Sequence, residues 1–151
     1  KNTIMKNLEF KIQINAPIAK VRDTMLSDKG YRDWTSVFNP VGSWFEWEWS
    51  TWSDIRFLGP DPKHPEDIGG MYGTIKENKL HEYIAIEYIG EIQNDQEIPK
   101  PARKWALEQY TFSSSENGTS LKIDLQTTED AADYLQQMWP KALQKLKTLC
   151  E

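Results

Sequence analysis

The side chains that could support catalysis are few in this sequence, and their spacing does not gather them. A general base near neutral pH is most often a histidine, and the chain has only His64, in a proline-rich stretch, and His81, after a predicted turn. Neither these distant histidines nor Cys150 provide the converging ligands of a metal site. Gly69-Gly70 lacks a following Lys-Ser/Thr and precedes a strand pattern, so it does not predict a phosphate loop. We therefore predict no catalytic residue, no metal and no cofactor.

Glu87 is the carboxylate for which the sequence most favours burial. It lies in a β-branched and aromatic stretch, residues 81–92, in which both faces of a strand would be largely apolar. A buried carboxylate needs a partner or a raised pKa, and Arg56 is a candidate partner. Two interpretations stay open. The favoured one is an ion pair on the outer face of a sheet, and the other is an active site that also includes Arg56 and Tyr110.

A dense aromatic segment points to a different chemistry, the recognition of apolar molecules. The stretch VGSWFEWEWSTW, residues 41–52, holds four of the 7 tryptophans. Side chains alternate between the two faces of a strand, so Phe45, Trp47 and Trp49 should share one face while the intervening glutamates face water. Such a face fills a core or lines an apolar pocket, and the sequence leaves both open.

Hydrophobic periodicity predicts the elements that must position these side chains. Alternation over residues 8–14 predicts a strand, and residues 17–27 predict an amphipathic helix, followed by a break at Gly30 and one further turn over residues 31–34. Six more strands are expected over residues 41–50, 53–58, 71–77, 81–92, 105–113 and 120–126. Proline-containing loops are expected over residues 59–67 and 93–103. A helix of about 22 residues should run from Glu129 to Cys150, with a kink at Pro140.

These elements predict an α+β fold: one domain over residues 1–151, in which a curved antiparallel sheet in β-α-α-β6-α order wraps around the long C-terminal helix. That helix is the only element large enough to cover the apolar face. The space between a curved sheet and one helix could hold a small apolar or aromatic molecule. The residues expected to line it are Phe45, Trp47, Trp49, Ile55, Phe57, Met71, Tyr110, Leu135, Met138 and Trp139.

Composition argues against several other classes of partner. A net charge of -5 disfavours nonspecific nucleic-acid binding, because phosphate contacts need clustered Lys and Arg. No apolar run approaches the ~20 residues of a membrane span, and the first residues lack the apolar core of a signal peptide. The single cysteine, Cys150, cannot form an intramolecular disulfide. We therefore expect a cytoplasmic protein with no membrane insertion and no nucleic-acid partner.

Five local strings carry a resemblance that covers nearly the whole chain: INAPIAKVRDTMLS (residues 14–27), GSWFE (42–46), IRFLGP (55–60), IGGMYGTIKEN (68–78) and WPKALQKLK (139–147). They resemble the START/Bet v 1-like (SRPBCC) superfamily, and within it the small bacterial proteins named after the activator of Hsp90 ATPase. The resemblance implies the helix-grip fold. Proteins of this kind tend to carry glycine where this chain has Trp47 and Trp52, so an inward Trp47 would narrow the pocket.

The resemblance also implies two alternative functions beside the binding of an apolar small molecule. The superfamily contains polyketide cyclases and aromatases, which makes an enzyme of that type the first alternative. A chaperone-linked protein that uses its surface is the second. The eukaryotic Hsp90 activators have a separate N-terminal domain that this sequence does not contain, so we do not expect Hsp90 as a partner. A homodimer is left open.

Overall fold

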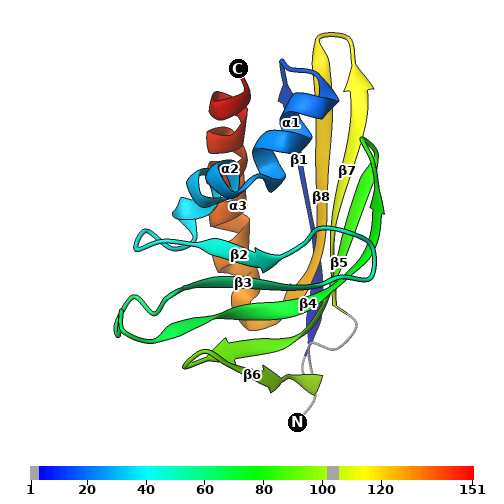
Figure 1. Ribbon diagram of the computed structural model, residues 1–151. Helices are drawn as coiled ribbons and strands as arrows, with labels where there is room; N and C mark the ends of the chain where they lie inside the picture. The colour runs from blue at the N-terminus through cyan, green and yellow to red at the C-terminus, as the bar shows by residue number, and fades with distance from the viewer. Residues whose placement is uncertain (1–3, 102–105) are drawn as a thin grey trace.

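The computed structural model describes residues 4–101 and 106–151 (Figure 1). Its strands are β1 (Met5–Ile14), β2 (Trp44–Trp47), β3 (Asp54–Pro60), β4 (Ile68–Lys79), β5 (Tyr83–Gln93), β6 (Gln96–Pro99), β7 (Leu107–Ser115) and β8 (Gly118–Thr128). Its helices are α1 (Ile18–Leu26), α2 (Asp28–Trp34), the 3-10 turn η1 (Thr35–Val37) and α3 (Glu129–Cys150). In this described part all strand pairs are antiparallel, in the order β1-β8-β7-β5-β4-β3-β2, and β6 pairs with β5.

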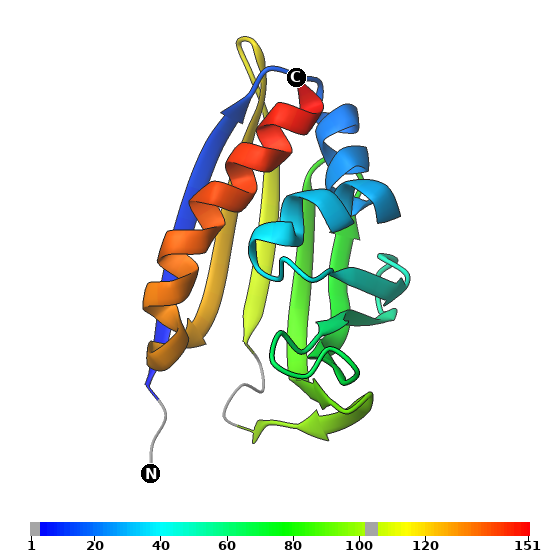
Figure 2. The same ribbon diagram turned by 90° about the vertical axis from the view of Figure 1, so that its left-hand side faces the viewer.

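The sheet curves strongly, and the helices fill its concave side. In Figure 1 the β2–β4 end of the sheet runs crosswise to the β1–β8 end. Figure 2 shows α3 lying along β1 and β8, with α1, α2 and η1 beside it over the rest of the sheet. The packing of α3 is mainly against β1, β8, α1, α2 and η1. The expected α+β helix-grip architecture is therefore confirmed, and α3 has the predicted bounds.

The connection between α1 and α2 differs from the prediction. Gly30 does not interrupt a helix but lies buried inside α2. Ser27 ends α1 and caps α2, and its hydroxyl accepts a hydrogen bond from the Gly30 amide at 3.1 Å. A Cβ at Gly30 would lie 1.7 Å from the Thr24 carbonyl oxygen. Glycine is therefore needed here for the close approach of the two helices, not as a helix breaker.

The aromatic strand is shorter than predicted, and Trp47 does not share a face with its neighbours. Strand β2 covers four residues, and at its last residue, Trp47, φ is 79°. This left-handed backbone turns the side chain out of the strand alternation. Trp47 is therefore 51% exposed, and its ring centroid lies 4.9 Å from Cζ of the Arg56 guanidinium. Phe45 and Trp49 remain partly buried against the core. The prediction of three inward rings was therefore wrong for Trp47.

Trp52 repeats this backbone geometry in the next turn. Its φ is 70°, its ring is exposed, and Lys76 Nζ lies 5.1 Å from the ring centroid. The Ser53 amide donates to the Ser50 carbonyl at 2.9 Å, which closes the turn that holds Trp52. Both tryptophans thus occupy left-handed positions, which glycine adopts without steric cost.

The predicted loop over residues 93–103 contains a strand that the proline-based prediction missed. Asn94 and Asp95, with φ of 50° and 61°, form a two-residue turn that pairs β6 with β5. Adjacent Asn and Asp tolerate positive φ and favour such hairpins. The predicted start of the next strand at Trp105 lies outside the described residues.

The exposed position of Trp47 leads to a stability prediction. Replacement of Trp47 by glycine should change the free energy of unfolding by no more than about 1 kcal/mol, because relief of the left-handed backbone offsets the lost cation–π contact. Trp49→Gly is the matched control and should cost roughly 3–5 kcal/mol, since its ring packs against the core. Urea denaturation measures both. A Trp47→Gly loss as large as that of the control would contradict the outward orientation.

Candidate functional site

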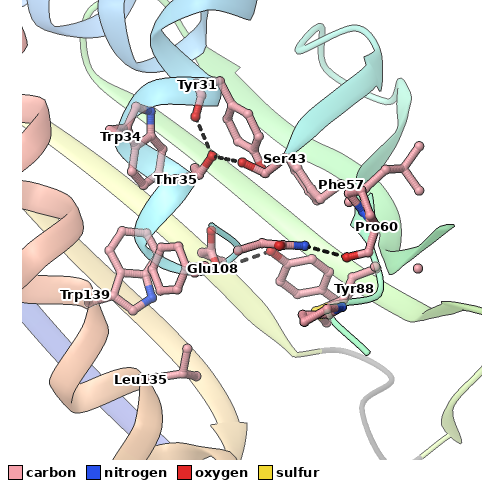
Figure 3. Close-up of a pocket in the computed structure, with 18 of the residues that line it drawn as sticks. Tyr31, Trp34, Thr35, Ser43, Phe57, Pro60, Tyr88, Glu108, Leu135 and Trp139 are labelled. Carbon is pink, nitrogen blue, oxygen red and sulfur yellow. Dashed lines mark hydrogen bonds between the residues drawn. The ribbon is translucent and has the colours of Figure 1, made fainter. Parts of the chain in front are cut away.

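A cavity of about 470 Å³ lies between α3, the α2–η1 segment and the β3–β5 region of the sheet (Figure 3). Its walls come from six segments of the chain, spread from α2 to α3. The described residues that line it are Tyr31, Trp34, Thr35, Phe38, Asn39, Ser43, Phe57, Leu58, Gly59, Pro60, Asp61, Pro62, Gly69, Gly70, Met71, Tyr88, Glu108, Tyr110, Leu135 and Trp139. Pro62 and Gly70 are exposed, so the cavity reaches the surface on the side of the β3–β4 connection.

Two aromatic clusters build the wall on the helical side. Trp139 of α3 contacts Phe38 and Trp34 with ring centroids 5.4 Å and 5.7 Å away. Tyr31 of α2 packs edge-on to Trp34 at 5.7 Å and stacks on Phe57 of β3 at 5.9 Å. The Trp34 indole donates to the Met25 carbonyl at 2.9 Å, which fixes the ring that joins the two clusters. The wall is therefore a connected set of rings.

Short hydrogen bonds hold the polar part of the rim. The Thr35 hydroxyl donates to the Tyr31 carbonyl and lies 2.5 Å from the Ser43 hydroxyl oxygen. The Asn39 side-chain amide donates to the Pro60 carbonyl at 2.9 Å. Figure 3 shows these bonds on the side of the cavity opposite Leu135. These contacts connect η1 and the segment that follows it to β3, so the rim is preformed in the absence of a ligand.

Glu108 is the carboxylate inside this aromatic cavity. The Tyr88 hydroxyl donates to its Oε1 at 3.1 Å, and the Tyr110 hydroxyl donates to its Oε2. Burial raises the pKa of Glu108. The hydrogen bonds from the two tyrosines lower this pKa, but by less than burial raises it, so the pKa stays above its ordinary value. The pKa of Tyr110 is raised well above its ordinary value, mainly by burial and secondly by the nearby Glu108 carboxylate. The same two causes raise the pKa of Tyr31.

A second cavity of about 240 Å³ lies on the far side of Glu108, toward the first turns of α3. Its other walls include Met5, Leu125 and Ala131. The side chains common to both cavities are Met71, Tyr88, Glu108, Leu135 and Trp139. Glu108 therefore lies where the two spaces meet, and a ligand in either of them would approach its carboxylate.

The structure places half of the predicted lining residues at the cavity. Phe57, Met71, Tyr110, Leu135 and Trp139 line it. Phe45 and Trp49 instead lie behind Tyr31, with centroids 5.3 Å and 6.4 Å from its ring. Ile55 is fully buried in the core, Met138 is half-buried on α3 away from the described lining, and Trp47 is outside.

The alternative active site of Glu87, Arg56 and Tyr110 is not assembled. Glu87 lies on the outer face of the sheet, 3.8 Å from Lys76, which agrees with the favoured surface ion pair but not with Arg56 as its partner. Arg56 instead pairs with Glu97 at 3.0 Å and lies near Glu46 and Asp95. Tyr110 points into the cavity, on the opposite face.

Glu108 was missed, although the sequence contained a signal for it. It has the same strand parity as Tyr110 and Phe112, so it is a charged residue on the apolar face of a predicted strand. Glu87 was instead the candidate for burial, because both faces of its strand are largely apolar. Apolar residues on both faces do not indicate which face of the sheet packs against the helices. Parity with two inward aromatic residues is the more informative pattern.

Two further features of residues 4–101 and 106–151 bear on function. Within these ranges no three or more His, Cys, Asp or Glu side chains gather in a way that could hold a metal ion. None of the helices in the same ranges combines the length and the apolar character that a bilayer crossing requires.

The raised pKa of Glu108 predicts a pH dependence of stability. The folded protein holds this proton more tightly than the unfolded chain, so its contribution to stability is present below the ordinary carboxyl pKa and is lost as pH rises through the raised pKa. Glu108→Gln should therefore gain stability relative to wild type as pH rises from the ordinary carboxyl pKa through the raised pKa of Glu108, as measured by urea denaturation. Glu87→Gln, on the outer face, is the matched control. A Gln variant that loses relative stability over this range would show that the carboxylate is stabilised by folding.

Comparison with known proteins identifies the fold. Neither a protein-family model nor a curated protein matches the sequence. Among solved structures, a protein from Chromobacterium violaceum matches with a TM-score of 0.73 at 16% identity over 97% of this chain and 98% of that one. The Aha1 dimer from Colwellia psychrerythraea gives 0.71 at 16% identity over 97% and 96%. The AHSA1-like protein from Aeromonas hydrophila gives 0.68 at 12% identity over 95% and 90%. The chain therefore shares the fold of these three proteins, two of which are AHSA1-like or Aha1 proteins, and this is the helix-grip fold that the resemblance implied.

Proposed function

We propose that the protein binds a small apolar or aromatic molecule in the cavity between the sheet and α3. The observation that carries the proposal is the cavity of about 470 Å³ with seven described aromatic residues in its lining. Ligand pockets commonly measure about 300–1,000 Å³ and combine apolar walls with a few polar groups. Glu108 and the rim of Thr35, Asn39 and Ser43 are such polar groups.

The binding surface in this proposal consists of the side chains that face the cavity from both layers. Leu135 and Trp139 contribute the helical side, and Phe57, Met71 and Tyr110 contribute the sheet. Ligand binding would remove these apolar surfaces from water, which is worth roughly 25 cal/mol per Å². The hydrogen-bonded rim and the interlocked rings reduce the ordering that binding requires. A preformed cavity of this kind favours binding over a role that uses the outer surface alone.

Two further parts of the proposal concern the setting of the protein. We place it in the cytoplasm, because its one cysteine, Cys150, is buried and free, which fits a reducing compartment. The Colwellia protein of the same fold was solved as a dimer, and a homodimer is proposed for this chain on that basis alone.

A fluorescence titration tests the proposed function. The neutral apolar probe N-phenyl-1-naphthylamine should bind saturably and quench tryptophan emission, because Trp34 and Trp139 line the cavity. Leu135→Trp should fill the space and weaken binding by about tenfold or more. Leu149→Trp introduces the same side chain on the same helix at a 38% exposed position and serves as the control. Equal affinity of the two variants, or no saturable binding by wild type, would refute the proposal.

A further inference from the structure

Among the residues that the structure describes, every charged side chain that lines the cavity is acidic. Glu108 lies inside and Asp61 lies on the loop at the exposed side, and no Lys, Arg or His is part of the described lining. The Asp61 carboxylate accepts a hydrogen bond from the Lys63 amide at 2.8 Å, which holds it in the loop. A ligand with a carboxylate or phosphate inside the cavity would therefore meet repulsion and no described counter-ion.

The hydrogen bonds of Glu108 leave it able to accept further donors. Each carboxylate oxygen has two lone pairs, and each receives one hydrogen bond from a tyrosine, Tyr88 or Tyr110. None of the ion pairs between described residues involves Glu108. A neutral apolar ligand that displaced water from this site would leave the carboxylate less solvated, which is costly. A ligand with a positive charge next to Glu108 would replace that water with an ionic partner.

The aromatic walls favour the same kind of ligand. Tyr88 and Tyr110 donate hydrogen bonds to Glu108, and Trp139 lines both cavities together with Tyr88 and Glu108. Tyr31 and Phe57 also line the larger cavity. The face of an aromatic ring attracts cations, and cages of such rings recognise quaternary ammonium groups. Rings and carboxylate therefore act together on one positive group.

From this arrangement we infer that the ligand class is an organic cation: an amine or a quaternary ammonium group attached to an apolar or aromatic body. The cationic group lies beside Glu108 among Tyr88, Tyr110 and Trp139. The apolar body lies against Phe57 and Leu135 in the larger cavity. The inference rests on the proposed function and narrows it to one charge class. Fatty acids and other apolar anions are disfavoured by the same geometry.

A pair of ligands with the same shape tests the charge preference without any mutation. Phenyltrimethylammonium and tert-butylbenzene differ by one positive charge. Their dissociation constants are measured by tryptophan fluorescence at low ionic strength and at a pH above the raised pKa of Glu108, where its carboxylate is charged. Wild type should bind the cation more tightly by about tenfold or more. Equal or tighter binding of tert-butylbenzene overturns the inference and leaves the proposed function standing. Saturable binding of neither compound overturns both.

Substitution of Glu108 then locates the origin of the preference. Glu108→Gln keeps the size of the side chain and its capacity for hydrogen bonds, so it should weaken phenyltrimethylammonium binding by about tenfold and change tert-butylbenzene binding by less than about twofold. Glu87→Gln removes the same charge from the outer face and should leave both affinities unchanged. If Glu108→Gln binds the cation as wild type does, or if both glutamine variants weaken it equally, the assignment to Glu108 is wrong. Thermal unfolding of each variant verifies that it is folded.

Discussion

The contact of Trp139 with the rings of the helical layer is the constraint on which the rest of the structure depends. Trp139 packs against Trp34, Phe38 and Tyr110, so α3 is fixed over β1 and β8. Tyr31 extends this cluster to Phe57 on the other part of the sheet. Because the sheet curves away beneath these rings, they do not fill the space between the sheet and α3. The cavity follows from bulky rings packed between a long helix and a curved sheet.

The same packing sets the electrostatics of the site. Strand β7 directs both Glu108 and Tyr110 toward α3, and Tyr88 of neighbouring β5 reaches the same carboxylate. A carboxylate in an apolar space costs free energy unless hydrogen bonds or a charge compensate it. Two tyrosine donors compensate part of that cost, and burial still raises the pKa of Glu108. A negative charge inside an aromatic cavity lowers the stability of the fold. Charged groups held in this way are a common feature of functional sites.

Much of the fold could be predicted because hydrophobic periodicity decides it. The bounds of α3 and the inward face of β1 follow from simple counting. Trp47 was misplaced because strand alternation assumes extended backbone, and its left-handed φ breaks that assumption. The glycine that the resemblance implies at the positions of Trp47 and Trp52 was the available sign of this geometry. Glu108 and its partner Tyr110 could have been found from parity on one strand, but the partner Tyr88 could not. Tyr88 reaches Glu108 because β5 pairs with β7 in a register that places Ile86 opposite Glu108, and residue spacing does not reveal that register.

The most direct test of a ligand cavity at this position is anomalous diffraction from a crystal soaked in bromobenzene. The account predicts a bromine peak between Trp139 of α3 and Phe57 and Tyr88 of the sheet, with these side chains close to the positions described above. A solid interior in which Trp139 or Leu135 fills the space, with no bromine peak there, would contradict it.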